Sequence, residues 1–130
     1  MTRLFTVREA NELIPTLSES LRDLLAKREE LQVRRRELAA LEVRARSDGQ
    51  EMAAAVTQTR RALDDLMAEM NDGIDRITAL GCELKDLAHG LIDFPSSRDG
   101  RRVYLCWRLG EEHVAFWHEL ESGFAGRQPL

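Results

Sequence analysis

Three ionisable side chains near the C-terminus have the types that could bind a metal ion: Asp93, Glu111 and His118. A histidine with two carboxylates is a ligand set that suits Zn²⁺, Mn²⁺ or Fe²⁺. Glu111 and His118 are seven residues apart, a rise of about 10 Å on one helix, so they share an ion only if that helix bends or begins after Glu111. Asp93, Glu111 and His118 are the candidate metal ligands. The chain has neither an HExxH motif nor a cysteine ligand pair to support them.

A simpler interpretation of His118 is favoured over a metal site. It could be partly buried and hydrogen-bonded to Asp93 or a glutamate, fixing the C-terminal segment in place. Catalysis by Asp93 or Glu111 with His118 would need burial to shift their pKa values. The sequence shows no nucleophile motif, phosphate-binding glycine loop or cofactor fingerprint, and a carboxylate beside Cys106 would disfavour its thiolate. A protein that is not an enzyme is therefore favoured.

Three further residues could bind a small ligand: Trp107, Trp117 and Arg127. The tryptophans, with Phe124, could line a pocket, and Arg127 could clamp an anion. Aromatic residues in such a position are more often core residues. Arg127 could equally form an ion pair with Glu83, Asp86 or Glu121, and these alternatives stay open.

Arginines in the middle of the chain could contact RNA or DNA through phosphates, and Arg34, Arg35, Arg60 and Arg61 are the candidates. No aromatic residue is interleaved with them to stack on bases, and glutamates dilute their charge. The formal net charge of −4 also argues against general nucleic-acid binding. A solvated helix surface is the favoured interpretation.

An apolar repeat of the heptad type predicts two long helical arms, residues 7–46 and 50–88. Thr6 and Glu9 form a capping-box pattern at the start of the first arm. Pro15 predicts a kink or a short first helix. A break at residues 47–49 would fold the arms into an antiparallel coiled-coil hairpin, with Leu31 near Leu66.

Residues 90–130 are expected to form a β-hairpin, a short helix and a tail. Asp99-Gly100 is a hairpin-turn signal, so residues whose numbers sum to 199 should pair. One face would then be apolar and pack on the helices, with Ile92 opposite Trp107, whereas the other would carry Asp93 opposite Cys106. The short helix is expected over residues 111–121. The predicted fold is therefore mainly α.

The size and composition favour a single domain over residues 1–130, because the chain has 130 residues and few aromatic ones, 5%. Two cysteines without metal-type spacing indicate buried, reduced thiols of a cytoplasmic protein. Neither a signal peptide nor a membrane span is expected. Two helices alone cannot enclose an apolar seam, so we expect a homodimer with a four-helix arrangement.

Several motifs together resemble an uncharacterised bacterial family, domain of unknown function 2203. They are residues 6–15, 90–95, 105–111, 117–118 and 123–127. The resemblance covers nearly the whole chain and implies no particular activity. The length of the apolar seam favours a non-enzymatic interaction or assembly protein, with a second copy or another protein as partner. The alternatives are binding of a divalent metal or small ligand, with or without hydrolysis, and nucleic-acid contact.

Overall fold

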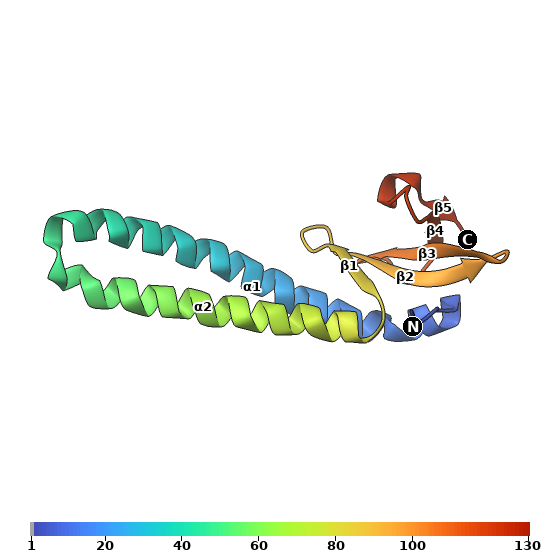
Figure 1. Ribbon diagram of the computed structural model, residues 1–130, viewed down its shortest axis with the longest axis horizontal. Coiled ribbons are helices and arrows are strands. Elements are labelled where there is room, and N and C mark those ends of the chain that lie inside the picture. Colours follow the sequence, from blue (N-terminus) through green and yellow to red (C-terminus); the bar gives the residue numbers. More distant parts are fainter. Residues whose placement is uncertain (1) are drawn as a thin grey trace. The chain divides into compact units, whose positions relative to one another are not determined.

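The computed structural model describes residues 2–130, without the side chain of Asp48, and confirms a mainly α fold. Two long helices are followed by one antiparallel sheet of order β1-β2-β3-β4-β5 (Figure 1). Helix α1 spans Val7–Asp48 and α2 spans Gln50–Ala79. The strands and the 3₁₀ turn are β1 Glu83–Asp86, β2 Leu91–Arg98, β3 Arg101–Arg108, β4 Phe116–Glu119, η1 Phe124–Gly126 and β5 Gln128–Pro129.

The chain divides into two compact units, which are described separately. One contains the N-terminal residues up to Asp23 together with Ile74–Leu130, and the other contains Leu24–Gly73. The organisation of residues 1–130 as a single domain remains a prediction. Neither helix is long and apolar enough to cross a membrane, over the residues described.

The capping box at the start of α1 is confirmed. The Thr6 backbone N–H donates to Glu9 Oε1 at 2.9 Å, and the Glu9 N–H donates to Thr6 Oγ1 at 3.1 Å. The hydrogen bond from the Thr6 N–H to the ionised carboxylate is the main cause that lowers the pKa of Glu9. Pro15 lies inside α1, which continues to Asp48, so the alternative of a short first helix was wrong.

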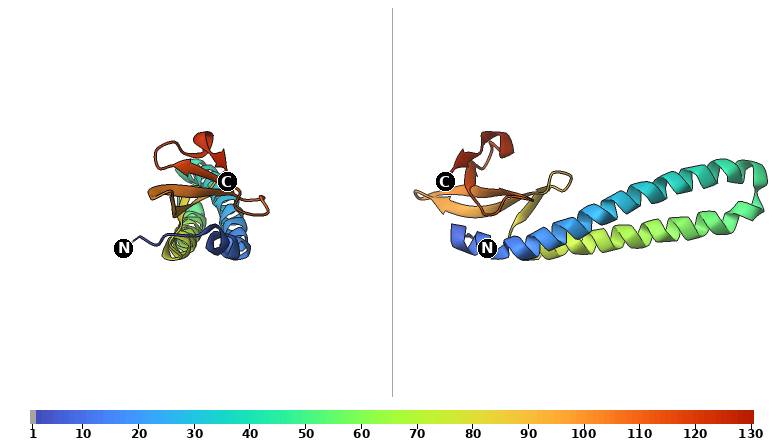
Figure 2. Two further views of the ribbon diagram at one scale, coloured as in Figure 1. Left: turned by 90° about the vertical axis from the view of Figure 1, so that its right-hand side faces the viewer. Right: turned by 180° about the vertical axis from the view of Figure 1, so that it is seen from behind.

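Gly49 reverses the chain between the two helices, as the sequence predicted. It has a positive φ of 53°, and its N–H donates to Ala45 O at 2.9 Å. Within Leu24–Gly73 the two helices run antiparallel, side by side in each view (Figures 1 and 2). Their core contains Leu31, Leu63 and Leu66, with Leu38 and Met70 partly buried against it, so the predicted neighbourhood of Leu31 and Leu66 is confirmed.

The second helix ends nine residues before its expected end, because α2 stops at Ala79 and not at residue 88. Gly81 explains this difference. It has φ +97°, and its N–H donates to Thr78 O at 2.9 Å, which closes the last turn. A Cβ at Gly81 would lie 3.1 Å from Arg3 Cδ, so this turn needs glycine for space as well. The chain then enters β1.

The predicted β-hairpin has the predicted register. Residues Leu91 to Arg98 pair with Arg108 to Arg101, and every pair sums to 199. Asp99 and Gly100 have φ values of 53° and 77°, as a two-residue hairpin turn with two positive φ angles requires. A turn read from two residues therefore fixed eight pairs of partners.

One face of the sheet is apolar and buried, as expected, with Ile92, Phe94, Leu105 and Trp107 at most 3% exposed. The N-terminal segment packs on this face. Phe5 meets Phe94 edge to face, with 5.2 Å between ring centroids. The Phe5 N–H donates to Pro95 O at 2.7 Å, and Ser96 Oγ donates to Phe5 O at 2.6 Å.

The helix expected over residues 111–121 is wrong, because Phe116–Glu119 form β4 instead. Trp117 pairs with Leu105 and His118 with Tyr104. Consecutive strand residues face opposite sides of a sheet, so Trp117 enters the apolar face while His118 lies on the other. In the described residues after Glu119, helical structure is limited to the 3₁₀ turn η1.

Candidate metal centre

The second face of the sheet brings together three ligating side chains, Asp93 from β2, Cys106 from β3 and His118 from β4. Asp93 pairs with Cys106, and His118 pairs with Tyr104, two residues from Cys106, so all three point to one side. One ligand atom from each lies within 4.8 Å of the other two. Asp93, Cys106 and His118 are 4%, 1% and 1% exposed, so all three side chains are buried.

Both ring nitrogens of His118 face oxygen atoms. Nδ1 lies 2.7 Å from the backbone oxygen of Glu119, which can only accept, so Nδ1 carries a proton and donates it. Nε2 lies 3.0 Å from each oxygen of the Asp93 carboxyl. One proton must therefore lie between Nε2 and Asp93, carried by either partner. A histidine that binds a metal characteristically donates its other N–H to a carbonyl or carboxylate in this way.

Burial controls the charges in this group. It raises the pKa of the Asp93 carboxyl, and the hydrogen bond from His118 opposes that rise. Burial also raises the pKa of Cys106 to about 12, with a further contribution from the Asp93 charge. Cys106 is therefore a thiol at neutral pH, as the neighbouring carboxylate led us to expect. At neutral pH Cys106 becomes a thiolate only when a cation binds beside it.

A pocket of about 180 Å³ opens beside the three residues. Lys85 and Tyr104 form part of its wall, and the segment after β4 contributes Leu120 and Phe124. The Tyr104 and His118 rings lie 5.5 Å apart, and Lys85 Nζ lies 4.8 Å from the centre of the Tyr104 ring. The hydrogen bond with Glu83 is the main cause that raises the pKa of Tyr104. The pocket therefore gives a small ligand a route to the group.

Glu111 does not join Asp93 and His118, although the sequence grouped the three. Both oxygens of its carboxylate accept from Arg127 Nη2, at 3.0 and 2.8 Å, and Oε1 also accepts from the Arg108 N–H at 2.7 Å. Arg127 thus forms an ion pair, but with Glu111 and not with the acidic residues expected.

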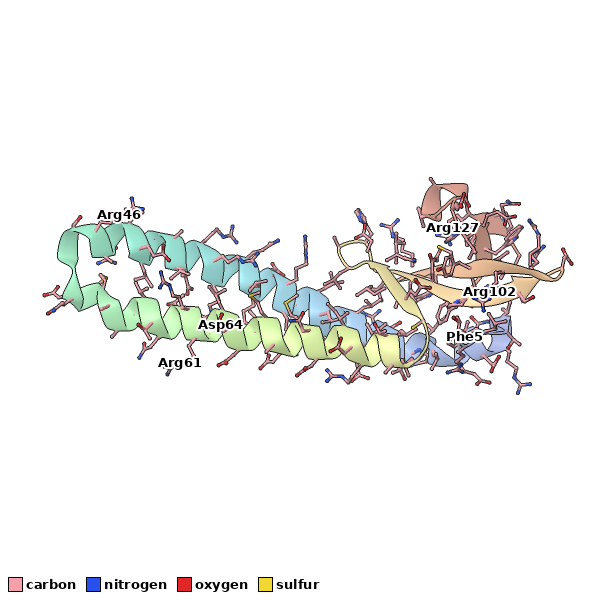
Figure 3. The ribbon with its side chains drawn as sticks, viewed as in Figure 1. Phe5, Arg46, Arg61, Asp64, Arg102 and Arg127 are labelled. Atoms are coloured by element: carbon pink, nitrogen blue, oxygen red, sulfur yellow. The ribbon has the colours of Figure 1, made fainter. Side chains whose placement is uncertain are left out.

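Arg127 holds the C-terminal tail in place. Its guanidinium carbon lies 3.8 Å from the centre of the Phe116 ring and 4.6 Å from that of Phe124, and it comes from the segment just after η1 (Figure 3). Its Nε is buried and has no hydrogen-bond partner among residues 2–130. Arg127 therefore anchors Phe124, one wall of the pocket, from outside the pocket itself.

Trp107 and Trp117 belong to the apolar face rather than to this pocket. Trp107 is fully buried and its Nε1 donates to Glu111 O at 2.9 Å. Trp117 is 7% exposed, and the Arg98 guanidinium lies 4.6 Å above its ring. The structure thus places both tryptophans in the core, as the favoured interpretation of these residues had it, and not in a ligand pocket.

The arginines singled out for nucleic acid lie on the surface of the helical hairpin. Arg34 contacts Glu30 at 3.8 Å and Glu37 at 3.1 Å, and Arg60 contacts Glu42 at 3.2 Å. Arg35 and Arg61 are exposed, and Arg61 points away from α1 (Figure 3). Glutamates thus engage two of the four arginines, which favours a solvated helix surface.

Cys106 is the candidate ligand that sequence reasoning left out. The register already placed it opposite Asp93, and that was the available signal. The helix wrongly assigned to residues 111–121 kept His118 away from the sheet. Placing Phe116–Glu119 as a strand beside β3 would have completed the group from sequence.

A sequence model of one family, described as "Uncharacterized conserved protein (DUF2203)", matches residues 3–130. No curated protein matches the chain, and no solved structure does.

Proposed function

Because the chain belongs to the uncharacterised family DUF2203, whose description names no activity, we propose a function from its own geometry. The protein binds a divalent transition-metal ion through Asp93, Cys106 and His118. Thiolate, imidazole and carboxylate together suit Zn²⁺ better than Mg²⁺ or Ca²⁺, which prefer oxygen ligands. Three protein ligands leave a fourth position of a tetrahedral ion for water or a ligand.

The observation that carries this proposal is the arrangement around His118. With Nδ1 fixed on Glu119 O at 2.7 Å, Nε2 is the nitrogen directed at Asp93, 3.0 Å from both carboxyl oxygens. A proton now joins these groups, and a cation in its place would bond both at once. Zn–N and Zn–O bonds of about 2.0–2.2 Å span such a separation when the ion lies off the line between them.

The charge of the group also fits a divalent ion. An ionised Asp93 and a Cys106 thiolate carry one negative charge each, and a neutral His118 adds none, so a 2+ ion makes the buried centre neutral. Burying an uncompensated charge is costly, and a centre with no net charge avoids that penalty. The raised pKa of Cys106, about 12, means that the thiolate forms together with metal binding.

Isothermal titration calorimetry with Zn²⁺ tests this function on untagged protein, after removal of metal with a chelator. We expect one ion per chain, and His118→Ala should weaken binding at least 100-fold because the centre loses a ligand. His113→Ala is the matched control, since His113 is exposed, and should bind as the wild type does. Glu111→Gln should also leave affinity unchanged. Equal affinity of wild type and His118→Ala would reject the centre.

A second candidate function is assembly through the helical hairpin Leu24–Gly73, with a second copy of the chain as partner. Val33, Val43 and Met67 are 42%, 60% and 43% exposed on these helices. Arg35 and Arg36 are exposed on α1, and a run of acidic residues is exposed on α2, namely Asp64, Asp65, Glu69 and Asp72. Two hairpins can therefore set basic α1 against acidic α2 and cover apolar side chains between them.

Analytical ultracentrifugation of charge variants tests this assembly. Asp64→Arg/Asp65→Arg should raise the dimer dissociation constant at least tenfold, because it places like charges together. Adding Arg35→Glu/Arg36→Glu to the same chain should restore association, which loss of folding would not explain. A wild type that sediments as a monomer at micromolar concentration would reject the dimer.

A further inference from the structure

A second hollow of about 280 Å³ adjoins the pocket beside the metal ligands. Asp86, His89 and Arg108 provide its polar lining, and Leu91 and Phe124 provide its apolar lining. Leu91 and Phe124 also line the first pocket. The two hollows therefore share an apolar wall, with the ligating group at one end and Arg108 at the other.

Arg108 supplies a guanidinium without a partner at the far end. Its guanidinium forms no hydrogen bond or ion pair with any of residues 2–130. Asp86, the acidic residue of this hollow, is already engaged, because its Oδ2 lies 2.8 Å from His89 Nδ1 and its Oδ1 accepts from the His89 N–H at 3.1 Å. The carboxylate of Glu111, which accepts from the Arg108 backbone, is held by Arg127.

The cation of the first pocket is compensated in a different way. Lys85 Nζ lies 2.9 Å from Glu83 Oε1, so its charge is matched by an adjacent carboxylate. With an ion bound, Asp93 and Cys106 would balance its two charges. A ligand that spans both hollows would therefore meet one guanidinium without a partner, that of Arg108, near the carboxylates of Asp86 and Glu121, and an apolar surface before it.

We propose that the joined hollows bind a small monocarboxylate with an apolar body. Its carboxylate lies at Arg108, its apolar body packs on Leu91 and Phe124, and its other end lies beside the metal ion, in the pocket next to Asp93, Cys106 and His118. Arginine binds carboxylates through two parallel N–H donors, and apolar contact favours a longer hydrocarbon body. This inference rests on the proposed metal function for the last of these contacts only.

The test is an NMR titration of ¹⁵N-labelled, zinc-loaded protein with acetate, butyrate, hexanoate and the uncharged analogue hexanamide. Affinity should rise about two- to fourfold for each added methylene, because each is buried against Leu91 and Phe124. Hexanamide should bind at least tenfold more weakly than hexanoate, and the amide signals of Leu91 and Phe124 should shift. Hexanoate binding no tighter than acetate would overturn the proposal.

Arg108→Gln provides the decisive variant, and Arg102→Gln is its control on the same strand, because Arg102 is exposed and lies outside both hollows. Hexanoate affinity should fall at least tenfold in the first variant and stay unchanged in the second, while zinc affinity stays unchanged in both. Equal hexanoate affinity in the two variants would overturn the carboxylate site and leave the metal function intact. If both Asp93→Ala and His118→Ala still bound zinc as the wild type does, the metal function would be rejected, and the carboxylate site would not be.

Discussion

Zinc binding to Asp93, Cys106 and His118 should release two protons per ion at neutral pH. One comes from the Cys106 thiol, whose pKa of about 12 keeps it protonated in the metal-free protein. The other is the proton held between His118 Nε2 and the Asp93 carboxyl, 3.0 Å apart, which the ion displaces. The count follows from the hydrogen bonds and from burial, and it separates this centre from adventitious binding to surface carboxylates.

The size of the effect follows from linkage. Release of two protons makes the apparent zinc affinity rise about 100-fold for each pH unit between pH 6 and 8. Ionising Cys106 at pH 7, about five units below its pKa, costs about 7 kcal/mol, which the new zinc–sulfur bond must offset. The affinity should therefore be modest near pH 6 and increase steeply above it.

Calorimetric titrations at one pH in buffers of different ionisation enthalpy measure the released protons directly. Cys106→Ala should release one proton and bind zinc more weakly, because one ligand and one titrating group are lost. A wild-type value near zero would show that zinc binds to surface carboxylates and not to this centre, since those carboxylates are already ionised at pH 7. A Cys106→Ala variant that releases as many protons as the wild type would show that the Cys106 thiol is not one of their sources.

Three further outcomes concern stability. Above pH 9 the free energy of unfolding should fall, because thiols in the unfolded chain have a pKa near 9, whereas folding raises the pKa of Cys106 to about 12 and that of Cys82 to about 11. Each thiol should lower the free energy of unfolding by about 2 kcal/mol by pH 10.5. Denaturation of Cys106→Ala across this pH range should show a shallower decline. Gly81→Ala should lower the free energy of unfolding, measured by urea denaturation, by about 2 kcal/mol, because Gly81 has a φ of +97° and an added Cβ would contact Arg3. The loss should be larger than for Gly49→Ala, where the added Cβ meets nothing within 4 Å, and equal losses would contradict this. Arg127→Lys should lower the free energy of unfolding by about 1–2 kcal/mol and speed amide hydrogen exchange in Phe124–Gly126, because lysine cannot reproduce the contacts with Glu111 and two aromatic rings. Unchanged exchange rates would show that Arg127 does not anchor this segment.

The sequence predicted best those features that depend on local signals. Asp99-Gly100 specified a two-residue turn, and the turn fixed the whole β2–β3 register, including Asp93 opposite Cys106. Thr6 and Glu9 marked the start of α1, and the break at residues 47–49 marked its end. In each case a few neighbouring residues determine backbone geometry without help from distant ones.

Predictions failed where the outcome depends on contacts distant in sequence. Leu84 and Leu87 continue the apolar repeat of α2, yet Gly81 ends the helix, because its positive φ and the packing of Arg3 and Phe5 outweigh the repeat. The spacing of Val114, Trp117 and Leu120 suited a helix, but Phe116–Glu119 gain more as a fourth strand that buries Trp117 and His118 on opposite faces. The spacing of apolar residues over ten positions carries no information about β3, whose unpaired edge is available to bind a further strand.

X-ray absorption at the zinc edge of the zinc-loaded protein identifies the atoms bound to the ion. We expect one sulfur at about 2.3 Å, from Cys106, with imidazole nitrogen and carboxylate oxygen at about 2.0–2.2 Å. The sulfur signal should vanish in Cys106→Ser. A zinc ion surrounded only by oxygen and nitrogen in the wild type would show that Asp93, Cys106 and His118 do not form its site.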